Sequence, residues 1–367
     1  MKIVQICKYR NSTVEGVDLF EEVLRAAEGH SRKFYILNGD AGDLSDRLGC
    51  ETVTFDLSKS AIKHIRLSAV LTVLKRLRHD KPDVIVTHRF KPAVFAAWLA
   101  PLFFRKTRKI AVIHNVGEFK KPRRLIFART LMRRWIFVAC SEAVRQDMLS
   151  RNFPSSQVIA IPNSVDEKLV RDNQLSREQA RQDLGIPADA KRVVGTIGRM
   201  RPVKGHKYFL EAMRDMEAPP YVAVIGDGEL LDEMRAAARE SNLSHRLIFA
   251  GGRKNAYRYM AAFDAFVMPS LREGLPIAML EAIASGVPAF GTPVGGIPEI
   301  LKNRKWVFPK EDPEALRQIL IHIANATDEQ LEETRQSQQK IFRDNFSIDQ
   351  YRSRFRSLME GTVQHSD

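Results

Sequence analysis

The sequence predicts two α/β domains, each built on a parallel sheet with helices on both faces. Short apolar segments typical of buried strands alternate with helical patterns through the first half of the chain. The alternation restarts near residue 192, after a polar stretch at 170–190 that is typical of a linker with a short helix. The 367 residues suffice for two domains of ordinary size. We expect domains at 1–169 and 170–345, with a final helix within 346–367.

The first domain is expected to hold seven strands, with helices at 17–27, 62–78 and 142–150 between some of them. The expected strands are 2–6, 33–37, 52–55, 83–87, 109–113, 135–139 and 158–161. Ligands of such sheets bind beyond the carboxyl ends of the strands. His88 and His114 end two of these segments. A lone histidine there is more often structural, but two on neighbouring strands favour a binding site.

The second domain opens with a strand at 192–197 that is followed by GRMRPVKGHK. Gly198 allows a tight turn, and Arg199 and Lys204 precede a helix expected at 206–216. Two cations near a helix amino terminus suit a diphosphate. The alternative is two surface cations in a loop. Further on, Asp227 lies in a G-x-G turn and is as well explained as a helix cap.

The stretch 265–285 carries two carboxylates around a predicted strand-to-helix turn. Glu273 ends the strand region, and Glu281 lies within the otherwise apolar helix IAMLEAIAS. Burying an unpaired carboxylate costs several kcal/mol unless donors meet it. The backbone N–H groups of Gly274 and Leu275 should form an anion site at the helix start. The helix dipole favours a glutamate at the amino terminus of a helix, and this alternative would explain Glu273 but not Glu281.

This pattern resembles a known signature. Glu273, seven residues and Glu281, with Gly-Leu-Pro after the first Glu, resemble the E-x7-E motif of retaining glycosyltransferases of family 4, which have the GT-B fold. The resemblance implies two doubly wound Rossmann-like domains that face a cleft. The first domain would bind the acceptor, the second would bind the nucleotide sugar, and the C-terminal helix would cross back to the first domain. It also implies that Glu273 meets the donor sugar and Glu281 the ribose.

The resemblance extends to other positions. The motif G-R-x4-K-G, which begins at Gly198, is the family's phosphate clamp, and His114 resembles its active-site histidine. The family usually has Gly-Gly after the first strand, whereas this chain has Glu15-Gly16, so Gly16 is expected to do part of that work. The expected catalytic residues are His114, Glu273, Arg199 and Lys204. The expected donor-binding residues are Gly16, Gly198, Arg199, Lys204, Gly252, Arg253, Glu273, Gly274, Leu275 and Glu281. The candidates for acceptor binding are Lys8, Tyr9, Arg10 and His88.

Most of the net charge of +14 lies in the first half of the chain. Residues 1–170 contain 30 Lys and Arg against 17 Asp and Glu, and residues 89–134 contain 13 basic residues and one acid. Such a segment attracts an anionic partner: a membrane surface, a phosphorylated glycan or a nucleic acid. Aromatic residues are interspersed, so the segment either lies on an anionic membrane or contributes its aromatics to the core and its cations to an acceptor site.

The expected function is therefore transfer of a sugar, with retention, from a nucleotide diphosphate sugar, with a UDP-sugar favoured. The expected acceptor is an anionic glycan or a lipid-linked glycan, as in cell-surface polysaccharide or lipopolysaccharide core synthesis. The chain has no Asp-x-Asp, and GT-B enzymes generally need no metal, so neither a metal nor another cofactor is expected. Nucleic acid is not an expected partner. The alternative function is a non-catalytic basic protein that binds membranes or nucleic acid.

The expected location is the cytoplasm, with peripheral binding to the cytoplasmic face of the inner membrane. Three cysteines without metal-like spacing fit a reducing compartment. The apolar run at 93–104 is too short to span a bilayer. A dinucleotide-dependent oxidoreductase is excluded, because no G-x-G-x-x-G follows the first strand.

Overall fold

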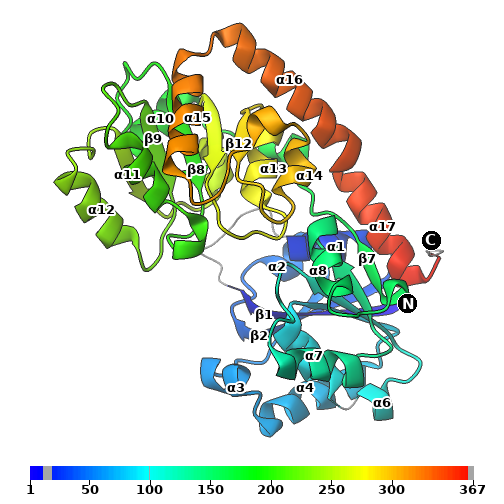
Figure 1. Ribbon diagram of the computed structural model, residues 1–367. Coiled ribbons are helices and arrows are strands. Elements are labelled where there is room, and N and C mark those ends of the chain that lie inside the picture. Colours follow the sequence, from blue (N-terminus) through cyan, green and yellow to red (C-terminus); the bar gives the residue numbers. More distant parts are fainter. Residues whose placement is uncertain (11–18, 99, 363–367) are drawn as a thin grey trace. The chain divides into compact units, whose positions relative to one another are not determined.

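The computed structural model describes residues 1–10, 19–98 and 100–362 (Figure 1). The chain divides into two compact units. The first unit is Met1–Asn163 together with Asp349–Asp367, and the second unit is Ser164–Ile348. The division thus falls at 163/164, where the sequence suggested 169/170. Residues 170–190 are part of the second unit and carry α9 (Glu167–Asp172) and α10 (Arg177–Leu184).

The first unit has a seven-stranded parallel sheet in the order β3-β2-β1-β4-β5-β6-β7. All seven expected strands are present: β1 (Lys2–Arg10), β2 (Ser31–Gly39), β3 (Glu51–Thr54), β4 (Val84–His88), β5 (Arg108–Ile113), β6 (Ile136–Ala139) and β7 (Val158–Ala160). The order reverses between β1 and β4. Ligands of open parallel sheets bind outside the carboxyl ends at such a reversal, so the ends of β1 and β4 mark the first unit's site.

Helices cover both faces of this sheet (Figure 1). They are α1 (Leu19–Ala26), α2 (Leu44–Leu48), α3 (Lys59–His64), α4 (Leu67–Asp80), α5 (Phe90–Ala97), α6 (Ala100–Phe103), α7 (Pro122–Leu131), α8 (Glu142–Leu149) and α17 (Ile348–Glu360). The single helix expected at 62–78 is wrong. Ile65 adopts φ 52° and caps α3, with its N–H donating to the carbonyl of Ala61, so a separate α4 follows. A β-branched residue rarely adopts this conformation, and the apolar pattern gave no sign of the break.

The last helix, α17, belongs to the first unit. Its apolar stripe is buried: Tyr351, Phe355 and Leu358 are each at most 3 % exposed. Arg108, at the start of β5, donates a hydrogen bond of 2.6 Å to the carbonyl oxygen of Met359. The helix is therefore part of the first unit's core, because its apolar side is fully covered there.

The second unit has a five-stranded parallel sheet in the order β10-β9-β8-β11-β12. The strands are β8 (Val193–Ile197), β9 (Tyr221–Ile225), β10 (Leu247–Gly251), β11 (Ala265–Met268) and β12 (Ala289–Gly291). The helices are α9, α10, α11 (Lys207–Met213), α12 (Leu231–Glu240), α13 (Ile277–Ala284), α14 (Ile297–Leu301), α15 (Pro313–Asn325) and α16 (Asp328–Asn345). The order reverses between β8 and β11, which places the loops after these two strands at the expected binding edge.

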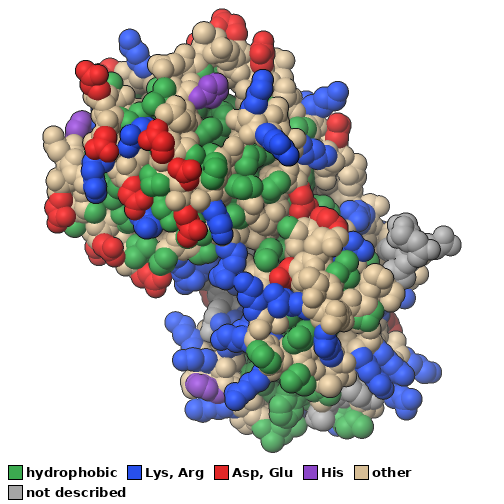
Figure 2. All heavy atoms as spheres, in the orientation of Figure 1, with side chains coloured by type: hydrophobic (Ala, Val, Ile, Leu, Met, Phe, Trp, Pro, Cys, Tyr) green, Lys and Arg blue, Asp and Glu red, His purple; other side chains and the backbone are tan. Residues whose placement is uncertain are grey.

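The two units differ in net charge. The first unit has 32 Lys and Arg against 18 Asp and Glu, whereas the second has 26 of each. Figure 2 shows Lys and Arg dense over the first unit and mixed with Asp and Glu over the second. The aromatic segment is divided: Phe95 and Phe104 are buried, but Trp98, Leu102 and Phe103 are 43 %, 69 % and 44 % exposed. Within the described ranges, no helix has the length and apolar character needed to cross a membrane.

Asp80, the last residue of α4, is a buried carboxylate that holds a group of charged and polar side chains together. Its carboxylate accepts hydrogen bonds from Lys33 Nζ at 3.0 Å, Arg76 Nε at 2.9 Å, His79 Nδ1 at 3.0 Å and the Tyr35 hydroxyl. Burial alone would raise the pKa of this carboxyl, but the hydrogen bonds outweigh burial and hold its pKa well below the usual range. Asp80 thus ties α4 to the amino end of β2.

We predict that Asp80→Asn lowers the free energy of unfolding of the first unit by about 2 kcal/mol at pH 7, because it removes the buried carboxylate that Lys33 and Arg76 share and leaves them only the more exposed Glu51. The folded-state pKa is depressed, so this stabilisation is present above the unfolded pKa of about 3.9 and is lost as pH falls below it. Urea unfolding at pH 7 and pH 3.5 measures both effects. Asp43→Asn, which removes an exposed ion pair to Arg47, is the control and should cost under about 1 kcal/mol. Equal losses in the two variants would contradict the assignment.

Candidate active site

The loop after β8 is held against its neighbours by backbone contacts that require glycine. Gly205 has φ +70°, and a Cβ there would lie 2.0 Å from the carbonyl oxygen of Pro269. A Cβ on Gly226, in the loop after β9, would lie 1.9 Å from the carbonyl oxygen of Gly198. Lys204 lies between these two approaches, in the 3₁₀ helix Pro202–Lys204. These close contacts fix the loop in place and thereby fix the position of Lys204.

Lys204 and Glu273 form an ion pair at the carboxyl edge of the second sheet. Lys204 Nζ lies 2.7 Å from Glu273 Oε1, and the Ser270 hydroxyl donates to the same oxygen at 2.7 Å. Glu273 is 9 % exposed. Gly295, with φ +56°, packs so closely that a Cβ would lie 2.2 Å from the carbonyl oxygen of Glu273. Two residues that the sequence placed at one site from separate motifs are thus in direct contact.

His206 is a member of this site that the sequence analysis missed. It is 4 % exposed, and its Nδ1 has no hydrogen-bond partner within the part of the chain that the structure describes. Burial, and then the nearby charge of Lys204, lower the pKa of His206 to about 4. The ring is therefore neutral at physiological pH. Its place two residues after Lys204 was the available signal.

Glu281 lies on α13 and is 6 % exposed, as its sequence context predicted. Pro276 is the cap residue of this helix. Gly274 and Leu275 precede the cap, and the carbonyl oxygen of Gly274 accepts a hydrogen bond of 2.6 Å from Gly296. This hydrogen bond to Gly296 holds the turn in place. Glu273 and Glu281 are therefore carried by one rigid strand–turn–helix segment.

The loop after β10 contains Gly252 and Arg253, two of the expected donor-binding residues. The Gly252 N–H donates to Asp227 Oδ1 at 2.9 Å, and a Cβ on Gly252 would lie 2.1 Å from the other carboxylate oxygen. Asp227 therefore joins two loops, and its interpretation as a helix cap is wrong, since Leu230 caps α12. Arg253 donates to the carbonyl oxygens of Gly252 and Asp183, each at 3.2 Å. Arg199 is exposed on the same edge of the sheet.

In the first unit the two histidines at the carboxyl edge contact one another. His88 Nδ1 lies 3.1 Å from His114 Nε2, and the rings are stacked at 24°. Phe20 of α1 packs on His88 with ring centroids 4.3 Å apart. Burial lowers the pKa of His114 to about 3 and that of His88 well below 6.5, and Arg89 lowers both further. Both rings are neutral, so one nitrogen of the pair donates and the other accepts.

A group of basic side chains lies around Lys91 of α5. Burial lowers the pKa of Lys91, and the nearby charges of Lys8, Arg124 and Lys63 lower it further. Glu118 pairs with Arg124 at 2.6 Å. The sequence named only Lys8 from this group, although the basic composition of 89–134 was a signal for Lys91 and Arg124. Tyr9 and Arg10 end β1, paired with Asn38 and Gly39. Gly16 lies outside the described residues.

Two family descriptions match successive parts of the chain. "Glycosyltransferase Family 4" matches residues 23–169, and "Glycosyl transferases group 1" matches residues 176–341. The chain belongs to the family 4 glycosyltransferases of the GT-B fold. The family's two parts correspond to the two parallel sheets described above, and the second includes Arg199, Lys204, Glu273 and Glu281.

Curated relatives of the family are similar over part of their length. The putative glycosyltransferase EpsF of Bacillus subtilis is 32 % identical over 170 residues, which are 45 % of this chain and 43 % of that protein. The Escherichia coli UDP-Gal:α-D-GlcNAc-diphosphoundecaprenol α-1,3-galactosyltransferase is 24 % identical over 254 residues, or 65 % and 64 % of the two chains. The chain thus spans between about two fifths and two thirds of these relatives.

Solved structures share the whole fold. Anabaena HepE in complex with UDP-glucose has a TM-score of 0.82 at 19 % identity, covering 98 % of this chain and 100 % of that one. The apo lipopolysaccharide outer core galactosyltransferase WaaB has a TM-score of 0.71 at 15 % identity, covering 99 % and 100 %. These likenesses establish the GT-B architecture that the sequence predicted.

We predict that neither His88 nor His114 gains a proton between pH 8 and pH 5, as measured by the chemical shifts of their imidazole protons. Their folded-state pKa values lie below the unfolded value of about 6.5, so the unfolded chain binds more protons and stability falls as pH drops below that value. His114→Gln keeps a hydrogen-bonding side chain but cannot titrate. It should reduce the slope of stability against pH between 4 and 6. A midpoint near 6.5 for either ring in the native protein would show that the pair is not buried.

Proposed function

We propose that the protein transfers a sugar from a nucleotide diphosphate sugar to a glycan or lipid-linked acceptor, with retention at the anomeric carbon. The observation that carries the proposal is the Lys204–Glu273 pair, formed by loops 69 residues apart in sequence at the reversal point of the second sheet. A cation and a carboxylate fixed together can meet the phosphate and the hydroxyl groups of one donor. The Anabaena relative crystallised with UDP-glucose supports a UDP-sugar as that donor.

In this proposal the second unit stabilises the leaving group. Departure of the nucleoside diphosphate builds negative charge on the β-phosphate, which Arg199, Lys204 and the backbone N–H groups of Gly274 and Leu275 would stabilise. Glu273 would accept hydrogen bonds from hydroxyl groups of the sugar through Oε2, since Oε1 already accepts hydrogen bonds from Lys204 and Ser270.

The remaining donor contacts follow the family pattern. Glu281 would bind the ribose, and Gly198, Gly252 and Arg253 would line the nucleotide, with Gly16 contributing next to the phosphates. The neutral His206 beside Lys204 adds no positive charge, so the field at the diphosphate comes from the two clamp cations.

The first unit would provide the acceptor side of the reaction. His114 is neutral and so would meet the sugar as a hydrogen-bonding ring, with His88 fixing its orientation at 3.1 Å. The departing phosphate would take the acceptor proton, because a ring with a pKa near 3 is a weak base. The cations Lys8 and Lys91, and the β1 end residues Tyr9 and Arg10, would receive an anionic acceptor.

The charge of the first unit supports an acceptor at an anionic membrane, and we place the protein at the cytoplasmic face of the inner membrane as a peripheral enzyme. Trp98, Leu102 and Phe103 are exposed apolar side chains in a strongly basic unit. Apolar anchors among cations suit reversible interfacial binding, in which each cation near anionic lipid contributes about 1 kcal/mol. Cell-surface polysaccharide or lipopolysaccharide core synthesis would supply such acceptors.

The proposal is tested with a panel of nucleotide sugars scored for slow hydrolysis, because hydrolysis needs no acceptor. We expect one or a few UDP-sugars to be cleaved to UDP with the released sugar first in the α configuration if the donor is α-linked. We also expect the rate to persist in excess chelator, since the charge on the diphosphate is met by side chains. Cleavage that stops with chelator and returns with magnesium or manganese would contradict a metal-independent mechanism. No turnover or binding of any nucleotide sugar would contradict the function.

We predict that Arg199→Ala and Lys204→Met each weaken UDP binding by about tenfold or more, because each removes a charge-assisted contact worth about 1.5–3 kcal/mol. Isothermal calorimetry measures the affinity. Lys207→Ala is the matched control: it removes the same charge three residues away, from an exposed side chain on α11 paired with Glu211. Its UDP affinity should stay near that of the native protein. Unchanged affinity in both clamp variants would refute their role, and a melting curve confirms that each variant is folded.

A further inference from the structure

A second basic pocket lies at the opposite end of the first unit's sheet from the histidine pair. Its volume is about 290 Å3, and it is lined by Arg105, Lys109, Thr130, Leu131, Arg133, Arg134 and Trp135. Lys109 is the second residue of β5, and Trp135 immediately precedes β6. His88 and His114 lie at the carboxyl ends of β4 and β5, so the length of the strands separates the two places.

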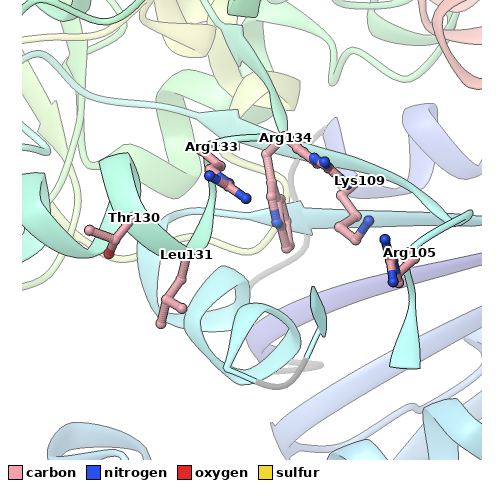
Figure 3. A pocket seen from close by; sticks show the side chains of 7 residues that line it. Arg105, Lys109, Thr130, Leu131, Arg133 and Arg134 are labelled. Atoms are coloured by element: carbon pink, nitrogen blue, oxygen red, sulfur yellow. The ribbon is translucent and has the colours of Figure 1, made fainter. Parts of the chain in front are cut away.

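Four of the seven lining side chains are cationic, and none of the seven is acidic. None of the four cations has an ion-pair partner among the residues that the structure describes. Figure 3 shows the nitrogen ends of Lys109 and Arg105 turned toward one another, with Arg133 and Arg134 on the other side of Lys109. Like charges repel at such distances, so the cluster costs free energy unless an anion joins it.

Lys109 is a buried cation of this cluster and has no carboxylate partner among the residues that the structure describes. It is 7 % exposed, and its ammonium donates only to the carbonyl oxygen of Thr107, at 2.7 Å, within the described part of the chain. Burial, and then the charge of Arg134, lower the pKa of Lys109. A buried ammonium without a carboxylate is rare in a structural role, because its desolvation is not compensated.

Trp135 supplies a second unsatisfied group in the same wall. The residue is 1 % exposed, and its indole Nε1 has no hydrogen-bond partner in the described ranges. Buried indole N–H groups usually find an acceptor. The pocket therefore combines several cations and an unpaired neutral donor, which are the groups that bind an oxyanion.

We propose that this pocket binds a phosphate group, as free phosphate or as the phosphodiester of a lipid headgroup. Lys109 and the Trp135 N–H would contact the phosphate oxygens at the base of the pocket. Arg105, Arg133 and Arg134 are exposed and would close around it. The volume admits a phosphate with a small ester group and lies just below the usual range for larger ligands. The exposed Leu102 and Phe103, three and two residues before Arg105, are placed to accompany a lipid-borne phosphate.

This site is separate from the proposed transferase chemistry. None of its lining residues belongs to the clamp, to the carboxylate pair or to the histidine pair. Its occupation therefore need not change UDP binding, and its failure would leave the transferase proposal standing.

The test compares the unaltered protein with three variants. Arg133→Gln with Arg134→Gln removes two exposed cations, and Trp135→Phe removes the indole N–H while keeping an aromatic ring. The control, Lys59→Gln with Lys75→Gln, removes two exposed cations from α3 and α4, outside the pocket. Calorimetry with inorganic phosphate and with glycerol phosphate forms one arm. Co-sedimentation with phosphatidylglycerol vesicles, against phosphatidylcholine vesicles, forms the other.

We expect the arginine pair to weaken binding by about tenfold or more and Trp135→Phe to weaken it by about three- to tenfold. The control should stay within about twofold, and UDP affinity should be unchanged in all variants. Phosphate binding in calorimetry identifies a free anion as the ligand. Binding that is confined to phosphatidylglycerol vesicles and lost in the same variants identifies a headgroup. No binding in either arm, or an equal loss in the control, would overturn the proposal.

Discussion

Parallel strands must be covered on both faces, and this constraint organises both units. Because each crossover helix returns the chain to the same end of the sheet, every loop after a strand emerges at one edge. The strand order reverses between β1 and β4 in one unit and between β8 and β11 in the other. The histidine pair and the Lys204–Glu273 pair both lie at these edges, so the position of the chemistry follows from the arrangement of the sheets.

Within the second unit, close contacts at glycines fix the loops that carry Lys204 and Glu273. The loops after β8, β9 and β11 approach so closely that a Cβ at Gly205 or Gly226 would strike backbone. Lys204 and Glu273 therefore meet without large rearrangement, and each partly neutralises the other before a donor arrives. A diphosphate entering the site would share Lys204 with Glu273. Pairing with a carboxylate holds the lysine in place at a modest loss of its attraction for phosphate.

The sequence predicted what depends on local pattern. Apolar runs located every strand of the first sheet and strands β8 and β11 of the second, and the isolated Glu281 in an apolar helix indicated a buried carboxylate, which is 6 % exposed. It did not predict the break at Ile65, because a β-branched residue with positive φ leaves no compositional signal. His206 was missed because its burial depends on the packing around Lys204.

The basic pocket could be predicted only in part. The sequence shows that cations are dense in 89–134, but it does not show which of them lie close together in the fold. Arg105, Lys109 and Arg134 come together because β5 and β6 pair in parallel, with Ile110 opposite Ile136, and this register is set by long-range packing. Trp135, immediately before β6, is buried in the same arrangement.

The placement of α17 has a consequence for the order in which the protein is made. The second unit is one continuous segment, Ser164–Ile348, whereas the first unit needs residues that follow it. On the ribosome the second unit can complete its core while the first still lacks the helix that buries Phe355 and receives the hydrogen bond from Arg108. Until the last turn of α17 emerges, the apolar side chains that pack against it stay open to solvent and to chaperones. The domain synthesised first is thus the one finished last.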